Sequence, residues 1–71
     1  MIIGWTIYDH PRDYPDCFVA RRWLTRNKQV IQTNDVLAAP TLDEIRALIP
    51  PGLVCFARHG LEDPAVVEVW L

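Results

Sequence analysis

Only one segment of the sequence has the pattern of an α-helix, and the residues around it keep that helix short. Thr41 is a good N-cap, and Glu44 three residues later completes a capping box. One apolar stripe follows at i, i+3, i+6 and i+7 spacing, formed by Leu42, Ile45, Leu48 and Ile49. Pro50 and Pro51 end the segment because neither can donate the helical hydrogen bond. A helix this short is not stable in isolation, so we expect it to pack against a sheet.

The rest of the chain alternates between short strand patterns and turn residues. Five segments rich in alternating or β-branched apolar residues predict strands: 2–8, 17–25, 30–38, 53–57 and 65–71. The third strand is expected to be interrupted at Asn34 and Asp35, which disfavour regular strand structure. The predicted fold class is therefore α+β, with the element order β-β-β-α-β-β and a small antiparallel sheet packed on one short helix.

Three positions indicate special backbone geometry. Gly4 lies inside the first predicted strand, which predicts a bulge or a close backbone approach. Asn27 is the residue of the 26–29 turn that best tolerates a positive φ. Pro51 and Gly52 fit the two central positions of a type II turn.

Length and composition predict one domain in a reducing compartment. The 71 residues have room for a single hydrophobic core, so residues 1–71 are expected to form one domain. No segment has the length and apolar character of a membrane span, and no secretory leader is expected. The chain has only two cysteines, so the expected location is the cytoplasm. Neither a cofactor nor a membrane partner is expected.

The charge pattern leaves nucleic-acid binding as an alternative function. The net charge of −2 argues against a general DNA-binding protein, which needs clustered basic residues. Four of the seven basic residues nevertheless fall within eight positions: Arg21, Arg22, Arg26 and Lys28. Together with aromatic side chains on a sheet, such a patch predicts a single-stranded nucleic-acid-binding domain whose affinity falls with added salt.

A small structural zinc module is the other alternative. Two imidazoles and two thiols have the right chemistry for a tetrahedral site: His10, Cys17, Cys55 and His59. Their spacing lacks the close cysteine pairs of most structural zinc sites. The competing interpretation places both cysteines as small buried apolar residues and both histidines in solvated loops.

No catalytic motif is present in the sequence. The chain has no serine, and its three glycines are isolated, so a serine nucleophile and a glycine-rich phosphate loop are both missing. Cysteine–histidine catalysis would need an orienting carboxylate and a glycine-rich elbow near the thiol, and neither is seen. We therefore expect a protein that is not an enzyme.

The sheet is expected to offer a surface to another protein. One helix covers only one face of a five-stranded sheet, so side chains on the other face stay accessible. Four residues of the second and fifth predicted strands are candidates for that face: Arg21, Trp23, Glu68 and Trp70. Arg21 and Glu68 would then form a cross-strand ion pair. Tryptophan and arginine are frequent anchors of protein interfaces, and the alternative is that the tryptophans fill the core.

The loop 9–16 adds further candidates for partner binding. It is long for a hairpin connection, and long loops in compact domains are often functional. His10, Arg12 and Tyr14 would project from it. The alternative is purely structural, because aspartate beside proline commonly bonds local backbone amides.

Three parts of the chain carry a resemblance. They are residues 8–16 leading into 18–21, residues 39–42 with 49–53, and residues 66–70. In these parts the chain resembles a family of small uncharacterised bacterial and phage proteins with a YDHPRDYPD-type opening. The resemblance implies a bacterial or phage setting and carries over no functional residue.

The preferred hypothesis is therefore a small non-enzymatic protein-binding module. A phage or prophage accessory protein that binds and modulates a host protein would fit the size and the resemblance. Self-association into a homodimer, through the uncovered face or through the edge of the last strand, is another form of the same hypothesis.

Overall fold

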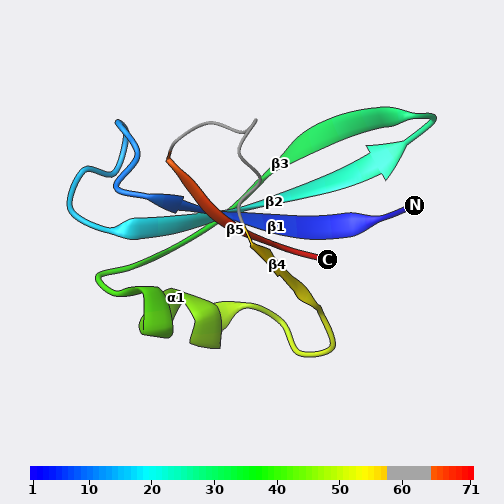
Figure 1. Cartoon of the computed structure of the whole chain (residues 1–71). Helices are drawn as coiled ribbons and strands as arrows, with labels where there is room; N and C mark the ends of the chain where they lie inside the picture. Colours follow the sequence, from blue (N-terminus) through cyan, green and yellow to red (C-terminus); the bar gives the residue numbers. More distant parts are fainter. Residues whose placement is uncertain (58–64) are drawn as a thin grey trace.

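Five strands form one antiparallel sheet, and one short helix packs against one of its faces (Figure 1). This computed structural model describes residues 1–57 and 65–71. The elements are β1 (Ile3–Asp9), β2 (Phe18–Arg26), β3 (Gln29–Ala39), α1 (Leu42–Leu48), β4 (Cys55–Ala57) and β5 (Val66–Trp70). The predicted α+β class and element order are confirmed. In the described residues, no helix has the length and apolar character needed to cross a bilayer.

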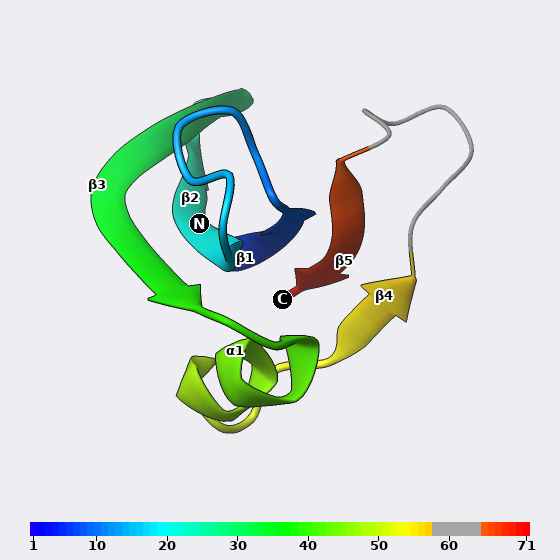
Figure 2. The ribbon, with the colours of Figure 1, turned by 90° about the vertical axis from the view of Figure 1, so that its left-hand side faces the viewer.

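The strand order in the sheet is β3-β2-β1-β5-β4, so the first strand lies at the centre. The last strand, β5, pairs with β1 and β4, so the expected free edge of that strand is wrong. In both ribbon views α1 lies on one side of the sheet and the loop between β1 and β2 on the other (Figures 1 and 2). Observed strand boundaries differ from the predicted ones by one or two residues at most ends. β4 is shorter than predicted, although Val54 still exchanges two backbone hydrogen bonds with Leu71, at 2.9 and 3.1 Å.

The β2–β3 hairpin closes through a two-residue turn. Asn27 and Lys28 both have positive φ, 52° and 64°, which is the geometry of a type I′ turn. The positive φ predicted for Asn27 is confirmed, whereas that of Lys28 was not predicted. Gly52 has φ 89°, as expected for the third residue of a type II turn.

The predicted interruption of β3 is a bulge opposite Arg22. The pairing passes from Arg21–Val36 directly to Trp23–Gln32, which leaves residues 33–35 opposite one residue of β2. The Thr33 hydroxyl donates to the Arg22 carbonyl oxygen at 3.1 Å and accepts from the Asp35 amide at 3.2 Å. These bonds satisfy backbone groups that the broken ladder would otherwise leave unpaired.

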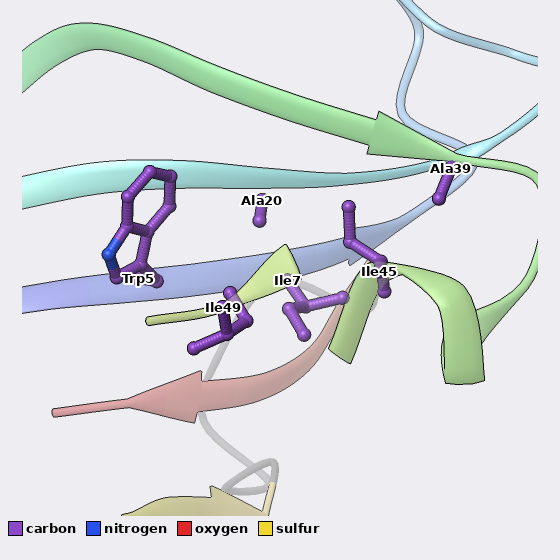
Figure 3. Packing of buried hydrophobic residues seen from close by; sticks show 6 residues of the cluster. All are labelled: Trp5, Ile7, Ala20, Ala39, Ile45 and Ile49. Atoms are coloured by element: carbon purple, nitrogen blue, oxygen red, sulfur yellow. The ribbon is translucent and has the colours of Figure 1, made fainter. Parts of the chain in front are cut away.

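The core lies between α1 and the face of the sheet that the helix covers (Figure 3). It consists of Trp5, Ile7, Ala20, Ala39, Ile45 and Ile49. Trp5 and Ile7 alternate along β1, so both point toward the helix. Ile7 and Ile45 have no exposed surface at all, and they join the central strand to the helix.

The helix begins as predicted but its apolar stripe is narrower. The Thr41 hydroxyl accepts the Glu44 backbone amide at 3.2 Å, which confirms the N-cap. Ile45 and Ile49 are buried, but Leu48 is 49% exposed, so its predicted place in the stripe is wrong. Consecutive residues lie about 100° apart around a helix, which turns Leu48 away from the side that carries Ile49.

Candidate protein-binding face

The face of the sheet opposite α1 is almost entirely uncharged. Because Trp5 and Ile7 point toward the helix, their neighbours on β1 point to this other side, and the pairing extends the assignment across the sheet. We call it the open face, and the register places on it Gly4, Thr6, Tyr8, Val19, Arg21, Trp23, Val30, Gln32, Val36, Phe56, Val66 and Val69. Arg21 is the single charged member of this set.

Several apolar side chains of the open face are accessible to solvent. Val30 is 64% exposed and Phe56 is 50% exposed, and the two residues belong to β3 and β4, the strands at the two edges of the sheet. Between the edges lies an apolar hollow of about 530 Å³, lined by Thr6, Tyr8, Trp23, Val30, Gln32, Val66 and Val69. Exposed apolar surface of this kind is a feature of interaction sites.

Trp23 is held in a fixed position on the open face. Its indole lies over Gly4, so a Cβ atom built on that glycine would come within 3.0 Å of three ring atoms. The indole Nε1 donates to the Thr6 hydroxyl at 2.9 Å. The group that lies close to Gly4 is thus the Trp23 side chain, and not the other backbone segment or the bulge that the sequence predicts. This contact and the hydrogen bond to Thr6 together fix the orientation of the ring.

A Gly4→Ala substitution is expected to lower the free energy of unfolding by about 1–3 kcal/mol, because the new methyl group overpacks against the indole. In a Trp23→Ala background the same substitution should cost almost nothing, since the clashing ring is gone. Urea unfolding of the four proteins forms a double-mutant cycle that measures this coupling. Equal costs of Gly4→Ala in both backgrounds would show that the ring does not lie over Gly4.

The loop between β1 and β2 borders the open face at the Tyr8 end. Asp13 of the loop forms an ion pair with Arg21. A second hollow of about 530 Å³ lies between loop and sheet, lined by Tyr8, His10, Pro11, Arg12, Asp13, Arg21 and Ala65. The structure therefore brings the loop candidates His10 and Arg12 together with Arg21.

Local contacts give the loop its shape. His10 has a positive φ of 48°, its Nδ1 bonds the Asp9 carboxylate, and its ring meets Phe18 edge-on at a centroid distance of 5.2 Å. The Tyr14 amide donates to the Pro11 carbonyl oxygen at 2.9 Å, while 39% of the Tyr14 residue surface stays exposed. These contacts order the loop and leave the Tyr14 side chain accessible.

Two predicted members of the open face lie on the other side of the sheet. Trp70 pairs with Trp5, and Glu68 pairs with Ile7, so both point toward α1. The expected ion pair between Arg21 and Glu68 is therefore wrong. The strand register decides on which face of the sheet a side chain lies, because a one-residue shift moves every side chain of a strand to the opposite face.

Glu68 is buried and instead forms a polar cluster with the exposed helix residue Arg46. Glu68 is 8% exposed and accepts hydrogen bonds from Arg46 Nε at 3.0 Å, Arg46 Nη2 at 2.5 Å and Trp70 Nε1 at 3.2 Å. The Arg46 hydrogen bonds hold the pKa of Glu68 below its usual value, although burial acts in the opposite direction. The same contact raises the pKa of Arg46. The hydrogen bonds between Arg46 and Glu68 connect α1 to β5.

Cys55 lies beside this cluster on β4. Although the residue is exposed, partial desolvation of the thiol raises its pKa, and a hydrogen bond to Glu68 raises it further. Both effects favour the protonated thiol, which is the less nucleophilic form. The sequence interpretation missed Arg46, although a lone glutamate in an apolar strand is a signal that a basic partner is needed.

The placed members of the predicted zinc site do not gather. Cys17 immediately precedes β2, whereas Cys55 belongs to β4, and β1 and β5 lie between these strands. Within residues 1–57 and 65–71 no three histidine, cysteine or acidic side chains form a group that could hold a metal ion. His59 lies outside the described residues. Cys55 is exposed, so its competing interpretation as a buried residue is also wrong.

The predicted basic patch is divided between the two faces of the sheet. Arg21 lies on the open face and pairs with Asp13, whereas Arg22 points to the opposite face and pairs with Asp35 at 3.3 Å. Arg26 and Lys28 lie at the tip of the β2–β3 hairpin. Of the four residues of the patch, only Arg26 and Lys28 lie close together and take part in none of the observed ion pairs. Nucleic-acid binding therefore stays a prediction.

No protein-family model matches this chain, and neither a curated protein nor a solved structure is similar to it. The resemblance to small bacterial and phage proteins therefore stays a prediction.

Proposed function

We propose that this chain is a non-enzymatic protein-binding module whose partner docks on the open face. The observation that carries the proposal is the apolar hollow beside Trp23, on a face whose single charge is already paired. The Trp23 indole is half-buried, its N–H is satisfied, and its remaining accessible surface offers a rigid contact area at low entropic cost, which is typical of interface anchors.

The chemistry of the face defines the partner. The hollow suits one large aliphatic or aromatic anchor side chain, and Phe56 and Val30 extend the apolar area toward both edges of the sheet. Arg12 and Tyr14 of the loop supply a polar rim at the Tyr8 end. A standard interface takes about 800 Å² from each partner, roughly one sixth of this protein's accessible surface of 4990 Å².

The setting is part of the proposal. The resemblance favours a bacterial or phage protein, and the use of only two cysteines favours the cytoplasm. A host protein with an apolar projection would be a suitable partner. Modulation would follow from steric occlusion of that projection.

The test compares two variants of the open face with one variant of the opposite side. Trp23→Ala removes the anchor and Phe56→Glu places a charge on the face. Leu48→Glu places the same charge on the exposed side of α1, where the replaced leucine is 49% exposed. Circular dichroism first confirms that each variant is folded.

Each tagged variant is then used to capture proteins from bacterial extract, and the bound proteins are quantified by mass spectrometry. We expect one partner to be captured by the wild type and by Leu48→Glu, and to be lost with both open-face variants. Retention of that partner by Trp23→Ala and Phe56→Glu, or equal loss with Leu48→Glu, would remove the open face as the binding site.

A further inference from the structure

The outer edge of β3 is long and has few features that prevent pairing with another strand. β3 has 11 residues and lies at one end of the sheet, whereas the other edge strand, β4, has 3. In the part of the chain that the structure describes, β3 pairs only with β2. Residues 29–33 contain no charge and no proline, and Val30 and Ile31 are 64% and 41% exposed. Edge strands that avoid association usually carry such protecting residues.

The backbone groups of Val30 and Gln32 point away from the sheet. Thr25 lies opposite Val30, but the Thr25 amide donates to the Ile2 carbonyl oxygen at 2.8 Å, on the β1 side. Opposite residues of an antiparallel pair exchange either both hydrogen bonds or neither, so the amide and carbonyl of Val30 face outward. The backbone amide and carbonyl of Gln32, two residues further along β3, point in the same direction. These groups are free to pair with another strand.

We propose that two copies of the chain associate by antiparallel pairing of their β3 strands, centred on Ile31. In this register Val30 of one copy pairs with Gln32 of the second copy, and Gln32 with Val30. The five-stranded sheet is thereby doubled into one continuous sheet with a two-fold axis. Directly opposite side chains project to the same face, so both open faces lie on one side and stay free for the partner of the proposed function.

Charge complementarity favours a second copy as the occupant of this edge. Lys28 stands just before the uncharged segment and Asp35 just after it. In the antiparallel register the turn residue Lys28 comes to the end of the paired segment at which the second copy's bulge carries Asp35, and the two-fold axis repeats this approach. The Asp35 side chain is 61% exposed even while it bonds Arg22. A parallel arrangement would instead place Lys28 beside Lys28.

The experiment uses two charge variants of the full chain, Lys28→Glu and Asp35→Lys, in sedimentation equilibrium at low salt. We expect the wild type to sediment as a dimer. Each variant alone should associate at least about tenfold more weakly, because like charges then meet at both ends of the paired segment. Their equimolar mixture should recover the dimer. In the mixed pair the introduced glutamate meets the introduced lysine at one end, and the unchanged Lys28 meets the unchanged Asp35 at the other.

A Gln32→Pro variant tests the backbone pairing independently, because proline removes an outward amide that the monomer does not use. It should be folded and monomeric, and the charge variants decide the matter if it does not fold. A monomeric wild type, or a mixture that associates no better than its components, would overturn the proposal. So would a dimer that Phe56→Glu dissociates and the charge variants do not, because association would then occur through the open face.

Discussion

Replacement of Ile45 by alanine is expected to lower the free energy of unfolding by about 2–5 kcal/mol, the usual cost of truncating a buried isoleucine. Ile45 has no exposed surface and is the buried residue of α1 that packs in the core. A chain of 71 residues has a total stability of only about 4–11 kcal/mol. The melting temperature should therefore fall by at least about 10 °C, as measured by circular dichroism.

Leu48→Ala is the matched control on the same helix. It deletes a comparable aliphatic side chain, but Leu48 is 49% exposed, so the expected change is within about 0.5 kcal/mol. Similar losses for the two variants would mean that α1 is rotated relative to the orientation described above.

The second large effect is expected at Glu68. Replacement by glutamine removes the charge that accepts both Arg46 bonds, at 3.0 and 2.5 Å, and should cost about 2 kcal/mol at pH 7. The pKa of Glu68 is lowered in the folded state, so its contribution is present above the unfolded pKa of about 4.3. That contribution is lost as the pH falls through the lower folded pKa.

Urea unfolding of wild type and Glu68→Gln between pH 7 and pH 2 measures this effect. The difference between the two proteins should be largest at neutral pH and should close in acid. Asp43→Asn is the control, because Asp43 also lies near Arg46, at 3.7 Å, but its side chain is 96% exposed. It should follow the wild type closely. A Glu68→Gln variant that also matched the wild type at every pH would contradict a stabilising role for the cluster.

The fold was accessible from the sequence because its signals are local. Thr41 with Glu44 begins the helix, Pro50 ends it, and alternation or β-branched residues define the strands. The interruption of β3 at Asn34 and Asp35 could also be predicted, since these residues disfavour a regular strand. Gly4 indicates special geometry, but its sequence context does not reveal that the Trp23 side chain is the group that lies over it.

The composition of the open face was only partly accessible. Trp23 and Arg21 were assigned to it correctly, but Trp70 and Glu68 were not, because their side depends on how β5 pairs with β1. That register includes a shift between Ile7 and Tyr8, which no local pattern of β5 reveals. Pairing across most of the chain length is a non-local property.

The place of β1 at the centre of the sheet has a consequence for biosynthesis. During translation β2 follows β1 closely, so β1 can pair with it early. The other neighbour of β1 in the sheet is β5, which is translated after almost all of the described chain. Until then the nascent meander of β1, β2 and β3 leaves Trp5 and Ile7 without α1 or β5 against them. The β1–β5 pairing joins segments far apart in the sequence, and pairing of this kind is intrinsically slow, so we expect Trp5 and Ile7 to become fully buried only late in folding.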